Sequence, residues 1–99
     1  MEATDNLTIQ FNLLLNQVNG LIHKLFIQGI GQENIIISIP EHLINYLQEE
    51  MLATQSKALK IEDMRLSGCK VQYAYENKIT VFNKSRHLNK SEYYQIELL

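Results

Sequence analysis

The sequence predicts an α+β domain in two layers, in which two helices cover a mostly antiparallel sheet and the element order is α-β-α-β-β-β. Apolar residues recur every three or four positions over the first quarter of the chain, which is the period of one helix face. Three consecutive isoleucines follow at 35–37, and the last forty residues alternate between apolar and polar side chains, as strands do. We expect residues 1–99 to form a single domain, because 99 residues suffice for one modest core.

The first expected helix spans residues 5–28 and carries an a/d heptad pattern, widened by two residues at e positions. Such an apolar stripe must lie against a partner, which is either the sheet of the same chain or another copy of the chain. Gly29 stands where a left-handed residue ends a helix, and Ile30 can pack back on the last turn as in a Schellman motif. The stripe consists of Leu7, Phe11, Leu14, Leu15, Val18, Leu21, Ile22 and Leu25.

A strand is expected over residues 34–39 and a second helix over residues 40–53. The consecutive isoleucines of the strand indicate burial on both faces, so we expect an inner strand or one that the first helix covers. Pro40 suits the first turn of the second helix, because it has no backbone N–H to leave unpaired. Glu41 complements the helix dipole at the same end.

Four further strands are expected in the last forty residues, and the middle two are expected to form an antiparallel hairpin. With a three-residue loop at 76–78, Tyr75 pairs with Ile79 and one face of the hairpin stays apolar. A shorter loop would mix polar and apolar residues on each face. Gly68 indicates a bulge or bend before the hairpin. The four strands are expected at residues 60–66, 69–76, 79–83 and 92–98.

Composition and charge limit the environments in which the protein works. The formal net charge is −2, with both signs scattered along the chain, so there is no overall drive toward nucleic acid or an anionic membrane. The acidic first residues differ from a signal peptide, and no apolar run approaches the roughly 20 residues of a membrane span. The one cysteine, Cys69, forms no intrachain disulfide, which favours a reducing compartment. We expect a soluble cytoplasmic protein with no membrane partner.

Candidate catalytic and metal-binding residues do not gather into a motif. The three histidines lie in different expected elements, and none has a second ligand at metal-binding spacing. Cys69 has no identifiable histidine partner, and a lone cysteine of this kind is about ten times more often structural. The segment Gly29-Ile30-Gly31 follows a helix and lacks the third glycine of a nucleotide-binding loop. We therefore predict no enzyme activity, no cofactor and no metal.

The leading hypothesis is a non-enzymatic protein–protein interaction or assembly module that forms a homo-oligomer. Its basis is the excess of apolar faces in so short a chain: the helical stripe, a second amphipathic helix, the isoleucine strand and the apolar face of the hairpin. The partner is another copy of the chain or another protein, and the stripe of the first helix supplies the interface. A monomer that buries all these faces in its own core remains the competing interpretation.

A small nucleic-acid-binding or regulatory protein is the alternative function. It rests on the locally basic segment 84–90, which two tyrosines follow. Basic side chains beside aromatic rings can hold phosphates and stack bases, whereas a solvated loop between two strands is the simpler interpretation. The candidate contacts to nucleic acid or to an acidic partner are Lys84, Arg86, Lys90, Tyr93 and Tyr94.

The strand-to-helix passage Ile37-Ser38-Ile39-Pro40 and the segments Gly68-Cys69-Lys70-Val71 and Ile79-Thr80-Val81 resemble small accessory and virion proteins of tailed bacteriophages. The resemblance covers about residues 35–82 and contains no diagnostic motif. It implies an assembly role in a phage particle or a takeover role in the cytoplasm of a bacterial host, and it implies no catalytic residues. A protein of a bacterial mobile element would share these features.

Overall fold

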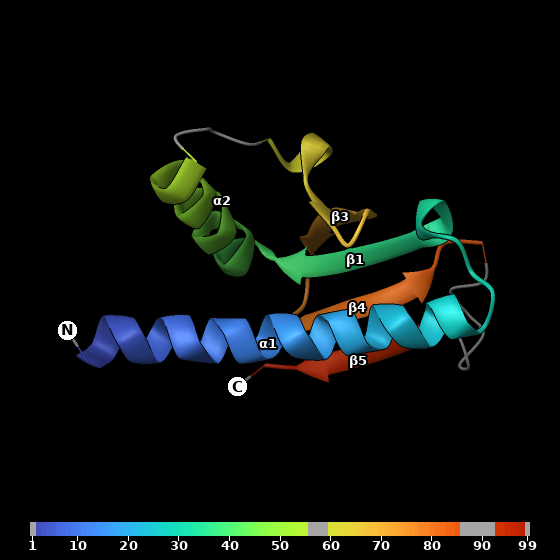
Figure 1. Ribbon diagram of the computed structural model, residues 1–99, viewed down its shortest axis with the longest axis horizontal. Helices are drawn as coiled ribbons and strands as arrows, with labels where there is room; N and C mark the ends of the chain where they lie inside the picture. The colour runs from blue at the N-terminus through green and yellow to red at the C-terminus, as the bar shows by residue number, and fades with distance from the viewer. Residues whose placement is uncertain (1, 56–59, 86–92, 99) are drawn as a thin grey trace.

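Over the residues that it describes, a computed structural model contains two α-helices and a five-stranded mixed sheet, which confirms the predicted α+β class (Figure 1). The structure describes residues 2–55, 60–85 and 93–98, and for residues 2–11 and 50–55 it describes the course of the backbone only. The elements are α1 Glu2–Ile27, the short 3-10 helix η1 Gln32–Asn34, β1 Ile35–Pro40, α2 Glu41–Gln55, a second 3-10 helix η2 Ile61–Asp63, β2 Arg65–Leu66, β3 Cys69–Ala74, β4 Lys78–Asn83 and β5 Tyr93–Glu97.

The central strand of the sheet is β1. All six of its residues are buried, and a strand that is apolar on both faces is best shielded from water between two other strands. The strand order is β2-β3-β1-β4-β5, in which β1 runs parallel to β3 and antiparallel to β4. The expected inner strand is therefore confirmed, and the sheet is mostly antiparallel with one parallel pair.

The expected hairpin between β3 and β4 does not form, because β1 lies between these two strands. Ile37 pairs with Val71 of β3 on one side and with Val81 of β4 on the other. The predicted pairing of Tyr75 with Ile79 is wrong: Tyr75 lies in the loop after β3 and its side chain is fully exposed. Proximity in sequence suggested a hairpin, but the isoleucines of β1 offer each strand a larger apolar partner.

Two connections allow β1 to occupy the centre. Parallel strands need a crossover of a dozen or more residues, and α2 lies in the connection from β1 to β3. The loop from β3 to β4 has three residues, 75–77, and must pass two strand spacings, about 10 Å. The four residue-to-residue steps from Ala74 to Lys78 can reach this distance at about 3.3 Å each. It passes the end of β1 beside Pro40 and Glu41, with which it lines a hollow of about 360 Å³.

The strand expected at 60–66 is only partly formed. Its first half is the 3-10 turn η2, and only the two residues of β2 pair with β3. Ser67 and Gly68 join β2 to β3, and both have positive φ angles, 52° and 81°. Two consecutive positive φ angles are the requirement of a type I′ turn, so the bend predicted at Gly68 is a tight hairpin turn.

Side chains from both helices pack on the face of β1 that carries Ile35, Ile37 and Ile39. Buried apolar residues of the described part of the chain form one contiguous cluster on this face. Cross-strand neighbours on β3 and β4 extend it sideways, because paired residues share a face of the sheet. The cluster contains Val18, Ile22, Leu25, Ile30, Ile35, Ile37, Ile39, Ile44, Leu47, Met64, Cys69, Val71, Ile79 and Val81.

The helix α1 is longer than the sheet that it covers. Its 26 residues extend for about 39 Å, whereas a six-residue strand spans about 20 Å. The carboxyl-terminal half of α1 lies along the strands, and the amino-terminal half continues past their ends, below α2 in the view of Figure 1. The sheet can therefore cover only the second half of this helix. Among the described residues, neither helix combines the length and the apolar character needed to cross a membrane.

Candidate interaction surfaces

The end of α1 is held by the hydrogen bonds of a Schellman motif, as the sequence predicts. The N–H of Ile30 donates to the carbonyl of Leu25 at 3.1 Å, and the N–H of Gly29 donates to the carbonyl of Phe26 at 2.9 Å. Gly29 has a φ of 90°, a left-handed conformation that costs residues with a Cβ about 1–2 kcal/mol. Ile30 packs into the core. This anchor and the buried stripe together set which side of α1 faces outward.

The predicted apolar stripe of α1 lies on the sheet of its own chain. Val18, Ile22 and Leu25 are 0–1% exposed, so they have no surface left for a second chain. Three further residues of the stripe are partly buried against the same core, namely Leu14, Leu15 and Leu21. The predicted interface residues Leu7 and Phe11 lie outside the described side chains. The sequence leaves two partners open for this stripe, the sheet of the same chain and another copy of the chain. In the described part of the helix the stripe packs on the sheet of the same chain.

The opposite side of α1 presents a line of residues that the sequence interpretation missed. Leu13 and Ile27 are 59% and 73% exposed, and Gly20 stands midway, seven residues from each. Positions seven apart differ by only about 20° around a helix, so these three residues form one line, here called the outward line of α1. A Cβ on Gly20 would meet nothing within 4 Å, so no contact inside the described part of the chain requires a glycine at this position.

The surface around the outward line carries almost no charge. Between Asn6 and Gln32 the only lysine, arginine, aspartate or glutamate is Lys24, although charged residues make up 20% of the chain. Depletion of charge around exposed apolar side chains is typical of the core of a protein interface. This depletion is visible in the sequence and could have revealed the surface. The exposed positions carry amides instead, at Asn12, Asn16, Gln17 and Asn19.

The single cation of this surface is engaged within the chain. The Nζ atom of Lys24 lies 5.4 Å from the centroid of the Tyr94 ring, within the range of a cation–π interaction. Gln28 donates a hydrogen bond from Nε2 to the Tyr94 hydroxyl at 3.1 Å. Tyr94, a predicted nucleic-acid contact, therefore lies on the helix side of β5 and contacts α1.

The sheet face turned away from α1 is polar and is called here the polar sheet face. The register places four uncharged side chains in one row across β3, β1, β4 and β5, namely Gln72, Ser38, Thr80 and Gln95. Gln72 donates from Nε2 to the Ser38 Oγ atom at 2.8 Å. Both of these residues and Thr80 line a hollow of about 230 Å³. The polar groups of this row are therefore partly paired with one another.

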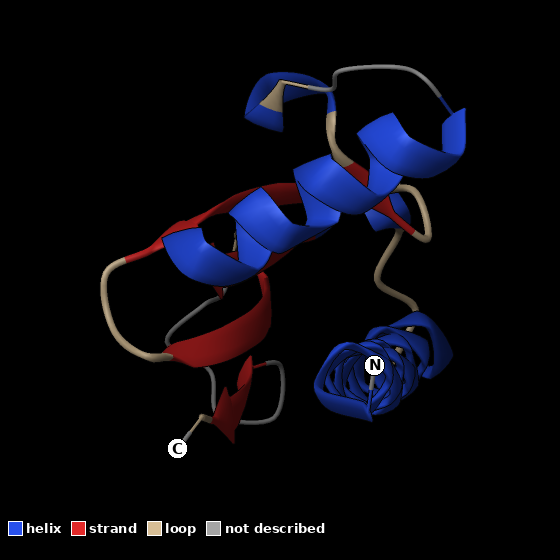
Figure 2. Ribbon diagram, turned by 90° about the vertical axis from the view of Figure 1, so that its left-hand side faces the viewer, coloured by secondary structure: helices blue, strands red, loops and turns tan. Residues whose placement is uncertain are grey.

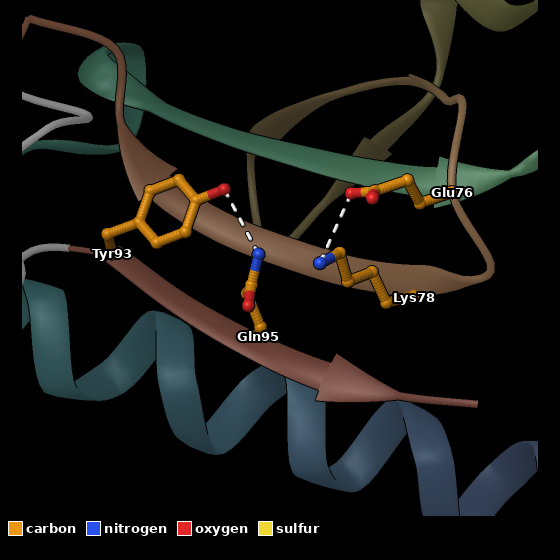
Figure 3. A network of polar contacts seen from close by, with 4 residues as sticks. All are labelled: Glu76, Lys78, Tyr93 and Gln95. Atoms are coloured by element: carbon orange, nitrogen blue, oxygen red, sulfur yellow. Dashed lines mark hydrogen bonds and ion pairs between the residues drawn. The ribbon is translucent and has the colours of Figure 1, made fainter.

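Figure 3 shows Gln95 of this row together with three further side chains, Glu76, Lys78 and Tyr93, on the side of the strands away from the helix. Lys78 Nζ lies 3.1 Å from Glu76 Oε1, and this hydrogen bond raises the pKa of the Lys78 amine. Gln95 donates from Nε2 to the Tyr93 hydroxyl at 3.1 Å. The Tyr93 ring packs on Phe82 with the ring centroids 5.8 Å apart. Aromatic and cationic groups thus share this face, although one cation is paired.

The predicted basic segment is only partly described. Lys84 is exposed, and its backbone N–H donates to the carbonyl of Asn34 at 2.8 Å. Arg86 and Lys90 lie outside the described residues. Tyr93 and Tyr94 lie on opposite faces of β5, because successive residues of a strand alternate. The opposite placement follows from the strand that the sequence predicts at 92–98, and it leaves only one of the two tyrosines on each face of the sheet.

Within the described residues, no group of three or more histidine, cysteine, aspartate or glutamate side chains could hold a metal ion. Cys69 is buried, and burial raises the pKa of its thiol. Its Sγ atom lies 3.8 Å from the carbonyl oxygen of Ser67, to which it donates. A buried and protonated thiol is a poor nucleophile, which fits the structural role that the sequence favours for this residue.

Comparisons with protein-family models, with curated proteins and with solved structures find no match to this chain. The function is therefore argued from its own surfaces. These are the outward side of α1, whose one cation is Lys24, and the polar sheet face.

Proposed function

We propose that this chain is a non-enzymatic protein–protein interaction and assembly module, and that its docking surface is the outward side of α1. As in the sequence hypothesis, the proposed partner is another copy of the chain, which makes the assembly a homo-oligomer. The supporting observation is the exposure of Leu13 and Ile27 on a helix side whose one cation is engaged. Burying such side chains is worth about 25 cal/mol per Å² of apolar surface.

The shape of the surface favours a protein as the partner. Sites for small molecules are concave pockets, whereas the outer side of a helix is convex. Phosphate groups need free cations, and Lys24 lies over the Tyr94 ring. A partner protein can follow the convex helix and cover Leu13 and Ile27, while amide groups of the partner form hydrogen bonds with the exposed asparagines of α1.

The way in which α1 is held also suits docking. The inner side of its carboxyl-terminal half is buried in the core, and the Schellman motif fixes its end. The outward side can therefore be covered by a partner without unfolding the helix. A rigid, preformed surface reduces the entropy lost on binding.

A photo-crosslinking amino acid at position 13 tests this proposal. We expect Leu13→benzoylphenylalanine, in the cells that naturally make the chain, to give a protein adduct of defined mass on irradiation. The same replacement of Tyr75 is the matched control, because Tyr75 is fully exposed and lies away from α1. An adduct of twice the chain mass of 11.5 kDa identifies a homo-oligomer. Absence of any adduct from position 13 contradicts the proposal.

The resemblance to tailed-phage accessory and virion proteins extends the proposal to a place of action. The chain would be made in the cytoplasm of a bacterial host and would enter the phage particle or act on a host protein. Quantitative mass spectrometry of purified particles and of infected cells checks this. Enrichment in particles supports the virion role, and production in cells that carry no phage genome contradicts the extension.

Single-stranded nucleic-acid binding is a second candidate function, favoured by one observation. The register on the polar sheet face forms a row that combines two cations with two aromatic rings, in the order Arg65, Lys70, Ile36, Phe82 and Tyr93. Cations hold phosphates, and aromatic rings stack on bases. We expect fluorescence anisotropy with labelled oligo-dT and oligo-U to show binding that weakens with salt. Lys70→Glu should abolish it and Lys60→Glu should not, and no binding at low salt rejects this candidate.

A further inference from the structure

The outward line of α1 is symmetric about Gly20. Leu13 and Ile27 lie about 10.5 Å from Gly20 along the helix axis, one on each side. Asn16 and Lys24 lie about 6 Å from it, again one on each side. A twofold axis that lies beside Gly20, between two facing helices and perpendicular to both, would therefore place each position opposite its counterpart in a second, antiparallel helix.

Resting on the proposed assembly function, we propose that the occupant of this surface is α1 of a second copy, which crosses antiparallel at Gly20. Leu13 then packs against Ile27 of the partner subunit. Asn16 is the axial counterpart of Lys24 of the partner subunit, so an uncharged amide faces each lysine across the pair. Figure 2 looks along α1 and shows the sheet and α2 on one side of it, so none of the described helices and strands lies on its outer side.

Gly20 is the first argument for a helix as the occupant. Its position is exposed, and a Cβ there would touch nothing in the chain. Packed helices lie 8–10 Å apart, depending on the side chains at their contact. A glycine at the crossing point allows the lower end of this range, because no side chain separates the two backbones.

The near absence of charge is the argument for a second copy. A twofold interface places the same patch against itself, so a charged patch would face its own charges. Between Asn6 and Gln32 only Lys24 is charged, and no like-charge repulsion opposes contact near the axis. In the antiparallel pair the two Lys24 positions are about 12 Å apart along the axis.

The same cation distinguishes antiparallel from parallel pairing. In a parallel pair the two Lys24 side chains would lie opposite each other, and the helix dipoles would point the same way. The antiparallel pair separates the lysines and opposes the dipoles. The contact runs over residues 13–27, about 22 Å of helix, which is short for a stable interface. We therefore expect a weak dimer whose population rises with concentration.

Site-directed disulfides test the geometry in a Cys69→Ala background, whose fold is checked by circular dichroism. We expect Leu13→Cys mixed with Ile27→Cys to form a disulfide-linked heterodimer under mild oxidation. Leu13→Cys alone should not link, because two Leu13 positions would be about 21 Å apart and a disulfide needs Cα atoms within about 7 Å. Asn45→Cys, on the exposed side of α2, is the control for random collision.

A second measurement uses Gly20 without any cysteine. Sedimentation equilibrium should show that Gly20→Leu lowers the association constant at least tenfold, while Asn45→Leu leaves it unchanged. Efficient linkage of Leu13→Cys with itself would overturn the antiparallel pair but leave the assembly function standing. A chain that stays monomeric at all concentrations overturns the second copy as occupant. The photo-crosslink at position 13 then separates the interaction function from the dimer. An adduct with a mass other than twice that of the chain would support the interaction function without the dimer, and the absence of any adduct would contradict both.

Discussion

Gly20 and Gly29 meet two different physical requirements in the same part of the chain. Gly29 has a φ of 90°, which only glycine adopts without strain, and its N–H bonds to the last turn of α1. Gly20 has the backbone of an ordinary helical residue and open space beside it. The first glycine is required by the fold, whereas the second weakens the helix and meets no requirement of the described part of the chain.

Alanine at these two positions should have opposite effects on stability. Gly29→Ala places a Cβ in the left-handed region and should lower the free energy of unfolding by about 1–2 kcal/mol. Gly20→Ala removes a poor helix former where space is free and should raise it by up to about 1 kcal/mol. Urea denaturation at low protein concentration, where self-association is weak, measures both. Effects of the same sign would contradict this account.

Cys69 should make the free energy of unfolding depend on pH at values above the pKa of an ordinary thiol. Burial raises the pKa of this thiol, so the folded chain keeps the proton at a pH where the unfolded chain has lost it. The unfolded state then binds fewer protons, and the free energy of unfolding falls as pH rises above about 8.5. Below about pH 8.5 the thiol is protonated in both states, so its burial contributes fully to the free energy of unfolding.

Urea denaturation of the natural chain and of Cys69→Ala at pH 7 and pH 9.5 checks this. The natural chain should lose more stability than the variant between the two values, since lysines and tyrosines titrate equally in both. An identical loss would show that the thiol is deprotonated as easily in the folded state as in the unfolded one.

At the scale of elements, the position of β1 decides the topology. Both faces of this strand are buried, and it pairs with β3 on one side and β4 on the other. A direct hairpin between β3 and β4 would have placed β1 at an edge of the sheet or outside it. Apolar matching over two strands therefore outweighs the short connection between β3 and β4.

Two truncations distinguish the observed topology from the predicted hairpin. Ile37→Ala should lower the free energy of unfolding by about 2–5 kcal/mol, because Ile37 is fully buried in the central strand. Tyr75→Ala should change it by less than about 0.5 kcal/mol, because the side chain is exposed in a loop. In a hairpin, Tyr75 would pack on Ile79 and its loss would destabilise the fold. Urea denaturation of both variants measures the two changes, and a large loss of stability in Tyr75→Ala would contradict the observed topology.

At the scale of the whole molecule, α1 makes the protein elongated. The principal extents are 42 × 27 × 24 Å, and the Cα radius of gyration is 13.7 Å, against about 13 Å for a compact domain of 100 residues. The excess comes from the amino-terminal half of α1, which passes the ends of the strands (Figure 1). The outer side of the same helix, which carries almost no charge, is thus presented along the longest dimension of the molecule.

Small-angle scattering should detect association through this helix. The radius of gyration should rise with concentration for the natural chain, between about 5 and 200 µM. The double variant Leu13→Lys, Ile27→Lys should keep the monomer value, because association would then bury lysines on an apolar contact. The matched control is Asn45→Lys with Tyr75→Lys, two exposed positions that belong to α2 and to the loop after β3. A control that also abolishes the rise would place the interface elsewhere.

The predictable part of the fold is the part that local physics decides. The end of α1 at Gly29 and Ile30 follows from hydrogen bonds between residues a few positions apart, and the burial of Val18 and Ile22 follows from the helical period. The observed bounds of the two helices and of β1 lie within three residues of those expected. The sequence interpretation missed the outward line of α1 because the a/d stripe dominates the apolar pattern of this helix. The scarcity of charged residues between Asn6 and Gln32 is nevertheless visible in the sequence.

The sequence by itself determined the two helices, β1 and the approximate course of β3, β4 and β5, because hydrogen bonding and side-chain periodicity act over a few residues. Only the tertiary structure decided that β1 separates β3 from β4 and that Leu13 and Ile27 are left outside. These outcomes depend on competition among strands and helices for the same apolar partners. Such competition joins residues that are distant along the chain, so no local pattern records its result.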